Sequence, residues 1–257
     1  MNSVNPVPTP VFLAGPTAVG KSEIALALAE KIGGEIITVD SMQVYRGLDI
    51  GTAKPTAAER RRVPHHLLDV CDLTEAFDAA QFTRRAHIAA AEIQSRGKTP
   101  IFCGGTGLYF KAFLEGVGEA PPGDARLRTE LEAAPLEQLL AELRERDPAT
   151  FEKIDRQNPR RVIRAVEVIR LTGKKFSAQQ AEWKAESGKR KAENYFCFTR
   201  PTEDLHQRIN VRVDEMFARG LVAETQELLK RGLAENKFAL QAIGYRQVAE
   251  HLRGERG

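Results

Sequence analysis

The sequence GPTAVGKS at residues 15–22 restricts the fold of this chain more than any other feature. It matches the pattern GxxxxGK[ST], and it lies between an apolar run, Pro10–Ala14, and an amphipathic helical pattern, Lys21–Ile32. Loops of this kind direct backbone N–H groups around a phosphate, and the helix N-terminus adds partial positive charge. Lys21 would contact terminal phosphate oxygens, and the Ser22 hydroxyl is placed to hold Mg²⁺. The residues of the predicted phosphate loop are Gly15, Pro16, Thr17, Ala18, Val19, Gly20, Lys21 and Ser22.

Short apolar runs alternate with helical patterns over the first hundred residues. Glu35–Val39 and Thr99–Cys103 are two further runs, and Ala79–Ser95 has the spacing of an amphipathic helix. Strands that alternate with helices form parallel sheets with right-handed crossovers. Ligands of such sheets bind outside the carboxyl ends of the strands. We therefore expect the phosphate loop and the loops at 40–45 and 104–109 to face one crevice.

The pattern changes after the Pro-Pro-Gly sequence at 121–123. From 126 to about 186 the apolar residues have helical spacing, as Val162 and Val166 illustrate, and Asn194–Thr199 (NYFCFT) then predicts another strand. We expect an α/β class protein in which a parallel sheet core, flanked by helices, is interrupted by an inserted helical domain. The core would comprise residues 1–122 and 194–257, and the insertion residues 123–193. Later helices are expected in the core at Glu203–Ala218, Val222–Lys230 and Tyr245–Leu252.

Basic residues are concentrated within and just after this insertion. Residues 156–200 contain 12 Lys and Arg against 4 Glu and no Asp, an excess of +8. Because the whole chain carries +3, the rest of it carries a net charge of −5. A basic region on a mildly acidic protein indicates a polyanionic partner. The charge by itself is equally compatible with a solvated helical face.

Composition excludes several classes of protein. No apolar run approaches the roughly 20 residues that a membrane helix needs. The cysteines, Cys71, Cys103 and Cys197, are scattered and form no CxxC pair, which argues against a disulfide framework and a cysteine zinc site. Met1–Pro10 lacks the basic and apolar segments of a signal peptide. We therefore expect a cytoplasmic protein, with no membrane partner, that is a monomer because no interface is indicated.

An acidic residue follows the second predicted strand at its carboxyl end. Asp40, in the sequence VDSMQVY, would lie beside the phosphate loop, where it could ligate Mg²⁺ or accept a proton from a nucleophile. Alternatively, its side chain could cap the turn that follows. Late in the core, no run of several apolar residues is followed by an acid in the manner of a Walker-B motif, so Asp40 is the acid available. A loop that binds β- and γ-phosphates can also hold a diphosphate that departs as a leaving group, so the loop alone does not establish phosphoryl transfer.

Taken together, several motifs resemble those of the tRNA dimethylallyltransferase family, which belongs to the isopentenyltransferases. They are GPTAVGKS (15–22), VDSMQVYRGLDIGTAKP (39–55), HHLLD (65–69), GGTGLYFKA (104–112), NPRRVIRAVEV (158–168) and AIGYRQ (242–247). DSMQVY followed by DIGTAKP at this distance behind the loop is the specific part, since many enzymes share the phosphate loop. The resemblance extends from about Val11 to the end of the chain, and it implies a P-loop NTPase-like fold.

This resemblance implies a reaction and a set of catalytic residues. Such enzymes transfer a dimethylallyl group from dimethylallyl diphosphate to N6 of the adenosine next to the tRNA anticodon (position 37), in tRNAs that read codons beginning with U. They release diphosphate and form N6-dimethylallyl adenosine (i6A). By similarity Asp40 is the general base, while Thr17, Lys21 and Ser22 with Mg²⁺ neutralise the leaving diphosphate. Arg208 and Arg212 fall where the family places a diphosphate-contacting arginine, although they could instead form surface ion pairs.

RNA recognition requires a pocket for one base and a surface for the rest, because the base must leave its stack. By similarity Ser41 and Gln43 line the base pocket, and Asp40 and Met42 are also expected to contact the tRNA. The further expected contacts of the anticodon stem-loop are Thr106, Arg128, Arg160, Arg161, Arg164, Gln241, Gly244, Tyr245 and Arg246. Arg160 and Arg164 are four residues apart and share a helical face, and they would make RNA binding depend on salt.

Two features depart from the family pattern. His65 and His66 have no third ligand nearby, so we expect them to be packing or turn residues rather than a metal site. Family members usually continue beyond AIGYRQ through another helix with a basic segment that helps to hold RNA, whereas this sequence ends at Gly257. Two explanations are open: either the sequence is truncated after Gly257, or this chain binds tRNA more weakly than other members of the family.

The residues leave three alternative functions open. A small-metabolite kinase that binds ATP would also need the phosphate loop, and the basic insertion could supply its lid. An adenine-nucleotide isopentenyltransferase would use the same chemistry on a free nucleotide, but a mononucleotide offers few phosphates for the +8 region. An RNA-binding module without catalysis would have no need of Lys21, Ser22 and Asp40 together.

Overall fold

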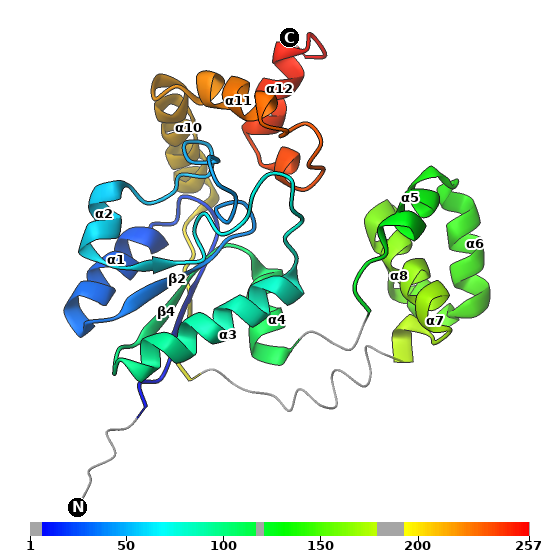
Figure 1. Cartoon of the computed structure of the whole chain (residues 1–257), viewed down its shortest axis with the longest axis horizontal. Coiled ribbons are helices and arrows are strands. Elements are labelled where there is room, and N and C mark those ends of the chain that lie inside the picture. Colours follow the sequence, from blue (N-terminus) through cyan, green and yellow to red (C-terminus); the bar gives the residue numbers. More distant parts are fainter. Residues whose placement is uncertain (1–6, 117–120, 179–192, 257) are drawn as a thin grey trace, which may run out of the picture. The chain divides into compact units, whose positions relative to one another are not determined.

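The computed structural model describes residues 7–116, 121–178 and 193–256. The chain divides into two compact units, the first made of Met1–Leu114 and Lys191–Gly257 and the second of Glu115–Arg190 (Figure 1). The sequence placed the corresponding boundaries at 122/123 and 193/194. None of the helices in the described ranges is long and apolar enough to cross a membrane.

A five-stranded sheet forms the centre of the first unit, with the strand order β3-β2-β4-β1-β5. Every pair of neighbouring strands is parallel, which confirms the predicted fold class. The strands are β1 (Val11–Ala14), β2 (Glu35–Val39), β3 (His65–His66), β4 (Pro100–Gly104) and β5 (Tyr195–Cys197). β1, β2 and β4 match the predicted runs to within one residue at each end, whereas β5 is shorter than Asn194–Thr199.

The edge strand β3 was not predicted. His65 and His66 pair with Ile36 and Ile37 of β2, and the Nε2 atom of His66 lies 2.7 Å from a carboxylate oxygen of Glu35. Of the two roles expected for these histidines, the strand contradicts the turn, whereas their partial burial against β2 is compatible with packing. A strand of two residues has no hydrophobic period of its own, so only its pairing with β2 reveals it.

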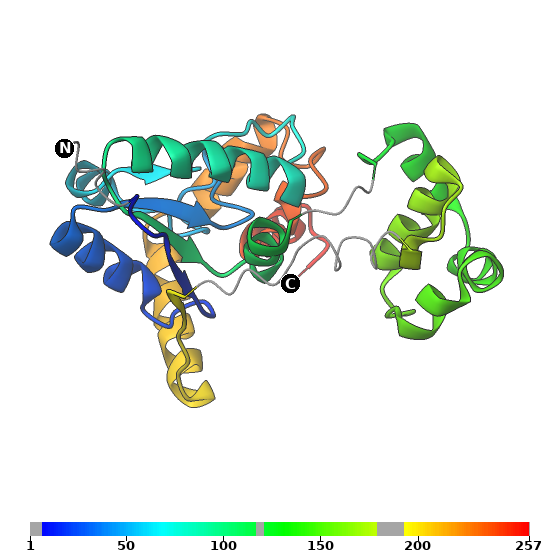
Figure 2. The same cartoon turned by 90° about the horizontal axis from the view of Figure 1, so that it is seen from below.

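Helices cover both faces of the sheet, because successive strand residues point to opposite sides. Leu13, Ile36 and Ile101 pack with the α1 helix (Lys21–Ile32) in one apolar cluster. Phe12, Ile37, Val39 and Phe102 pack in the other cluster with residues of α3 (Ala79–Ser95) and α4 (Gly107–Glu115). Figure 2 shows α3 and α1 on opposite sides of the sheet. The strands lack polar alternation because both of their faces are buried.

The remaining helices of the first unit lie mostly after the sheet in sequence. They are α2 (Ala57–Arg62), α10 (Thr202–Ala218), α11 (Leu221–Lys230), the short 3₁₀ helix η1 (Ala239–Gln241) and α12 (Tyr245–Leu252). α10 and α11 begin one residue before their predicted starts, and α12 has its predicted bounds. Leu221, Leu228, Tyr245 and Val248 join the same apolar cluster as α3, so the C-terminal helices are an integral part of this core.

The second unit is helical, as expected for the insertion. Its described helices are α5 (Ala125–Ala133), α6 (Leu136–Arg146), α7 (Pro148–Lys153) and α8 (Pro159–Thr172). Val162 and Val166 are fully buried against residues of α5 and α6, which confirms their predicted core positions. The side chain of Asn158 caps α8, and Gly173 ends it with a φ of 68°. The end of the predicted helical region, from 179 onward, lies outside the described residues.

The buried carboxylate of Glu35, at the start of β2, contacts one histidine and two basic side chains. Glu35 is 3% exposed and contacts His66, Arg96 and Lys98 at 2.7, 2.7 and 3.0 Å. Burial opposes ionisation, but the hydrogen bonds from these three groups outweigh it and lower the pKa of Glu35 to about 2. A folded-state pKa below the ordinary value means that this carboxylate stabilises the fold above about pH 4.5, and that its contribution is lost as the pH falls toward about 2.

Glu35→Gln is expected to lower the free energy of unfolding at pH 7 by about 1–3 kcal/mol, since it removes one charge from a buried cluster. Urea titrations from pH 7 to pH 2 check this, and the curves of wild type and variant should converge at the acidic end. Glu30→Gln is the matched control, because Glu30 pairs with Arg62 on the exposed surface. A constant difference at all pH values would contradict the ionic origin of the effect.

Candidate functional site

The loop between β1 and α1 is closely packed against the end of β5. A Cβ atom at Gly15 would lie 2.9 Å from the carbonyl oxygen of Phe198, so only glycine allows this approach. Gly20 has a φ of 100°, which also favours glycine, and α1 begins at the next residue. The Val19 side chain is 4% exposed. It therefore anchors the loop, and only its backbone can contribute to a phosphate site.

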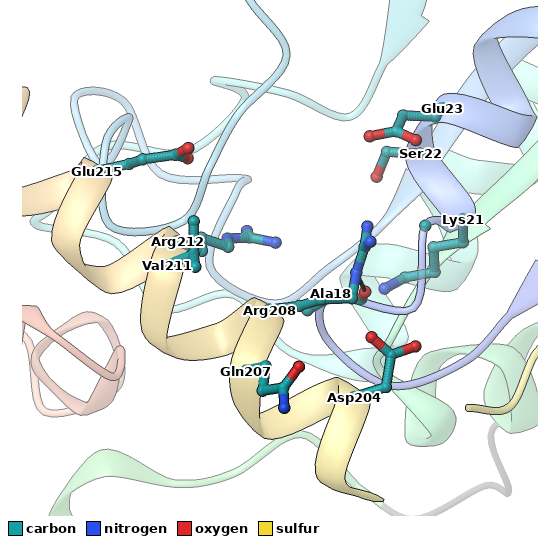
Figure 3. A pocket seen from close by; sticks show the side chains of 11 residues that line it. Ala18, Lys21, Ser22, Glu23, Asp204, Gln207, Arg208, Val211, Arg212 and Glu215 are labelled. Atoms are coloured by element: carbon teal, nitrogen blue, oxygen red, sulfur yellow. Dashed lines mark hydrogen bonds between the residues drawn. The ribbon is translucent and has the colours of Figure 1, made fainter. Parts of the chain in front are cut away.

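A cavity of about 540 Å³ opens beside this loop. Ala18, Gly20, Lys21, Ser22 and Glu23 line it from the loop and α1. From α10 it is lined by Asp204, Gln207, Arg208, Val211, Arg212 and Glu215. Figure 3 shows Lys21 and the two arginines reaching into this space from the two helices. Pro16 and Thr17 are exposed on the loop but do not line this cavity.

Lys21 is held at the mouth of the loop. Its ammonium group donates a hydrogen bond of 3.0 Å to the carbonyl oxygen of Pro16. Burial lowers the pKa of Lys21 from its ordinary value and nearby Arg212 lowers it further, whereas the charge of Asp40 acts in the opposite direction. The lysine thus lies in a partly desolvated site, where a bound anion would stabilise its charge.

Arginines of α10 complete the cationic lining. The Nε atom of Arg208 donates to the carbonyl oxygen of Ala18 at 2.8 Å. The Nε atom of Arg212 is buried and has no hydrogen-bond partner among the residues that the structure describes, and burial lowers the pKa of its guanidinium group. Neither arginine forms an ion pair with any described residue, so the surface ion-pair alternative was wrong. An unpartnered guanidinium N–H beside a phosphate loop is suited to an anionic ligand.

The sequence interpretation missed Arg200, which lies just before α10. Its Nε atom donates to the carbonyl oxygen of Val19 at 3.0 Å, and one of its terminal nitrogens pairs with Asp204 at 2.7 Å. Arg200, Asp204, Arg208 and Arg212 follow one another at intervals of four residues. That spacing places Asp204, Arg208 and Arg212 on one face of α10, with Arg200 just before its start, and it was the available signal.

Both predicted roles of Asp40 are compatible with the geometry. Its Oδ1 atom accepts hydrogen bonds from the backbone N–H groups of Met42 (2.8 Å) and Gln43 (3.1 Å), so it does cap the turn. Its Oδ2 atom has no partner among the residues that the structure describes. One oxygen therefore fixes the side chain and the other is available to accept a proton.

The loop after β4 is tied to the Asp40 loop. Thr106 accepts a hydrogen bond from the backbone N–H of Ser41 (3.2 Å) and donates its own N–H to Val39 (3.2 Å). A Cβ atom at Gly104 would lie 1.9 Å from the Val39 carbonyl oxygen. The three loops at the carboxyl ends of β1, β2 and β4 are thus close together, as the parallel topology predicts.

Gln43 and Met42, which are both expected to contact the RNA, also contact other parts of the fold. The amide nitrogen of the Gln43 side chain donates to the carbonyl oxygen of Thr52 at 2.8 Å, which leaves its amide oxygen for a ligand. Met42 is partly buried against the main apolar cluster. The sequence could not show these contacts, because their partners come from other parts of the chain.

Two of the predicted RNA-binding arginines share one buried carboxylate in the second unit. Glu167 is fully buried, and it accepts hydrogen bonds from Arg128 (2.7 Å) and Arg164 (2.6 Å). Arg164 also donates to the carbonyl oxygen of Pro121 at 2.7 Å. These two side chains therefore hold the unit together, whereas Arg160 and Arg161 are exposed. Arg160 and Arg164 were expected to act alike on one helical face, but Arg164 is engaged by Glu167 whereas Arg160 is exposed.

The predicted contacts near the C-terminus differ in exposure. Arg246 is half exposed and lies 3.6 Å from Glu250, and the Gln241 amide donates to the carbonyl oxygen of Lys237. Gly244 has a φ of 94° at the start of α12. The Tyr245 side chain is fully buried, so it offers no surface to RNA, and this part of the expectation is corrected.

The donor atoms at the loop suit a magnesium ion bound together with phosphate. Throughout the described ranges, no three His, Cys, Asp or Glu side chains gather as a metal cage. The Ser22 residue is exposed and lines the cavity next to Lys21. Mg²⁺ commonly takes one or two protein oxygens and completes its shell with substrate phosphates and water, so the Ser22 hydroxyl fits such an ion.

Comparison with known proteins finds similarity over both units. A family model described as IPP transferase matches residues 43–256. The tRNA dimethylallyltransferase 1 of Trichlorobacter lovleyi is 50% identical over 253 residues, which cover 96% of this chain and 82% of that protein. The solved full-length tRNA isopentenylpyrophosphate transferase of Bacillus halodurans is 39% identical, with a TM-score of 0.64 over 96% of this chain and 78% of that chain. A eukaryotic dimethylallyltransferase solved acting on tRNA is 28% identical, with a TM-score of 0.73 over 96% of this chain and 64% of that chain.

Proposed function

Because the chain belongs to the IPP transferase family, we propose that it transfers the dimethylallyl group of dimethylallyl diphosphate to N6 of an adenosine beside the tRNA anticodon. The product would be i6A at position 37 of tRNAs that read codons beginning with U, and diphosphate would be released. The observation that carries the proposal is the cavity at the phosphate loop, into which Lys21, Arg208 and Arg212 reach, with the open carboxylate oxygen of Asp40 on the adjacent loop.

The proton transfer follows from the chemistry of the acceptor. The exocyclic N6 atom is a weak nucleophile, since its lone pair is delocalised into the base. A new bond forms between N6 and C1 of the dimethylallyl group while the bond from C1 to the diphosphate oxygen breaks. N6 loses a proton in this step, and the free Oδ2 atom of Asp40 accepts it. The two backbone bonds to Oδ1 hold the carboxylate in one orientation.

Charge develops on the departing diphosphate, and the cavity supplies the groups that neutralise it. Lys21 and Arg212 present N–H donors from opposite helices, and Arg208 fixes the loop backbone through Ala18. By similarity Thr17 contacts the same leaving group. Ser22 would hold Mg²⁺, which when bound neutralises charge on the phosphate oxygens. Such an arrangement stabilises a diphosphate leaving group without transfer of a phosphoryl group.

A labelled-donor assay tests the proposal. The protein is incubated with Mg²⁺, labelled dimethylallyl diphosphate and an anticodon stem-loop that carries adenosine at position 37. The matched control is the same stem-loop with guanosine at that position, which lacks the N6 amine. Label on the adenosine RNA alone supports the proposal. Label on free AMP instead would favour the adenine-nucleotide enzyme, and phosphorylation from γ-labelled ATP with no prenyl transfer would favour the kinase.

Arg161→Ala is expected to weaken RNA binding without slowing the chemical step. The Arg161 side chain is exposed in the basic segment at 156–200, so its loss should lower the slope of log affinity against log salt by about 0.7 for one phosphate contact. Measurements of stem-loop affinity from about 50 to about 200 mM salt check this, because binding to phosphates weakens strongly over that range. The Arg164→Ala variant, unlike Arg161→Ala, should have a lower melting temperature than the wild type, because it loses a partner of the buried Glu167. An unchanged salt slope for Arg161→Ala would argue against a phosphate contact.

A further inference from the structure

Two C-terminal helices hold the loop at residues 48–54, which lies between β2 and α2. The backbone N–H of Ile50 donates to both carboxylate oxygens of Glu224 in α11, at 2.9 and 3.1 Å. The backbone N–H of Gly51 donates to the Tyr245 hydroxyl of α12 at 2.9 Å. The Tyr245 hydroxyl in turn donates to Glu224. Glu224 is therefore the acceptor that joins both helices to this loop.

Gly51 lies so close to Tyr245 and Leu221 that there is no room for a side chain. A Cβ atom there would lie 2.5 Å from Cε2 of Tyr245 and 3.0 Å from Cδ1 of Leu221. Burial raises the pKa of the Tyr245 phenol well above its ordinary value, and the hydrogen bond to Glu224 acts in the same direction. The hydroxyl thus remains protonated and continues to donate to Glu224 at any physiological pH.

The same loop is bonded to the residues that orient Asp40. The Thr52 carbonyl oxygen accepts the hydrogen bond of the Gln43 side chain at 2.8 Å. The backbone N–H of Gln43 is one of the two donors to Oδ1 of Asp40. Hydrogen bonds therefore join Glu224 to Ile50, Thr52 to the Gln43 side chain and the Gln43 N–H to Asp40, and the covalent backbone of residues 50–52 and Gln43 itself connects these three contacts.

We propose that Glu224 is a positioning residue for the reaction, acting through the 48–54 loop and Gln43 on the orientation of Asp40. This inference rests on the function proposed above, in which Oδ2 of Asp40 accepts the proton of N6. Loss of Glu224 removes the acceptor of the Ile50 N–H and of the Tyr245 hydroxyl, so the loop keeps its contact with Tyr245 at Gly51 but loses the carboxylate that holds Ile50 and orients that hydroxyl. The Thr52 carbonyl and the Gln43 side chain bonded to it can then shift, and small displacements of a catalytic group slow a reaction strongly.

Kinetics of Glu224→Ala test the proposal. The rate at saturating donor and RNA should fall by about tenfold, while KM for dimethylallyl diphosphate should stay unchanged, since the phosphate loop is not part of these contacts. Glu224→Gln should restore most of the rate, because its amide oxygen can still accept from Ile50 and Tyr245. Glu227→Ala is the matched control, since Glu227 lies on the same helix and pairs with Lys230 at the surface. An effect confined to KM, or equal losses in the Ala and Gln variants, would overturn the proposal.

A double-mutant cycle separates positioning through Gln43 from a general loss of stability. If Glu224 acts through Gln43, Glu224→Ala should slow a Gln43→Ala enzyme by less than about twofold, because the connection is already broken. Effects that multiply, so that the double variant loses the product of both factors, would overturn the assignment. Melting temperatures of all four proteins, measured at the same concentration, accompany the rates.

Amide hydrogen exchange tests whether Glu224 orders the Asp40 loop, and it does not require the protein to be active. In Glu224→Ala, exchange should accelerate in peptides covering 48–54 and in those covering 41–45, but not in those covering the phosphate loop. Acceleration limited to 48–54, or spread equally over the phosphate loop, would overturn the connection to Asp40. If the wild-type protein modifies no RNA, the proposed function fails, while this measurement still tests whether Glu224 orders the Asp40 loop.

Discussion

Asp40→Ala is expected to lower kcat by about 10²–10⁴-fold, the range observed when a general base is lost. KM for the stem-loop should change little, because the phosphate-binding and basic surfaces are retained. Single-turnover transfer of labelled dimethylallyl to RNA, with RNA binding measured in parallel, checks both statements. A variant that keeps the wild-type kcat would show that another group, or water alone, takes the proton.

Asp40→Asn separates the two roles of this side chain. The asparagine carbonyl oxygen can accept the backbone N–H groups of Met42 and Gln43, as Oδ1 of Asp40 does. Its amide nitrogen, however, cannot accept a proton. We expect Asp40→Asn to melt like the wild type and to lose as much kcat as Asp40→Ala, whereas Asp40→Ala should also melt earlier. Activity in the Asn variant but not in the Ala variant would mean that capping the turn is the essential role.

Lys21→Met is expected to reduce kcat by about 10²–10³-fold, which is typical for the loss of one donor that stabilises developing charge. The methionine stem fills a similar space, and the ammonium group that bonds to Pro16 is lost. KM for dimethylallyl diphosphate should rise as well, since the same charge binds the ground-state diphosphate. Lys31→Met, at the exposed end of the same helix, is the matched control and should behave like the wild type.

The pH dependence of kcat/KM for the donor provides a second measurement on Lys21. Because burial lowers the pKa of Lys21 in the free enzyme, its charge is lost at a lower pH than that of an ordinary lysine. Activity that needs the charged form therefore declines as the pH rises through this lowered pKa, at a lower pH than an unperturbed lysine would give. Lys21→Met should lack this alkaline decline. A decline that persists in the variant must come from another group.

Local patterns predicted the core elements well where the pattern itself has a physical cause. α1 and α3 have the predicted bounds because an amphipathic period, a cap at Asp78 and glycine after Ile32 all agree. β2 has its predicted bounds because a short apolar run between turns is buried on both faces. β3 and the end of β5 could not be predicted, since two or three residues contain no period and pair only through their neighbours.

The sequence by itself determined the phosphate loop and the place of Asp40 at the end of the second strand, because both depend on contiguous residues. The tertiary structure alone decided how the predicted site residues are used. Glu167 engages Arg128 and Arg164, and Glu224 engages Tyr245, through contacts between residues that lie from 3 to 39 positions apart. Which hydrogen-bond donors remain free for a ligand depends on such contacts. The Nε–H of Arg212 and the Oδ2 atom of Asp40 have no partner among the described residues. The tertiary structure therefore decides that these two atoms are available to a ligand.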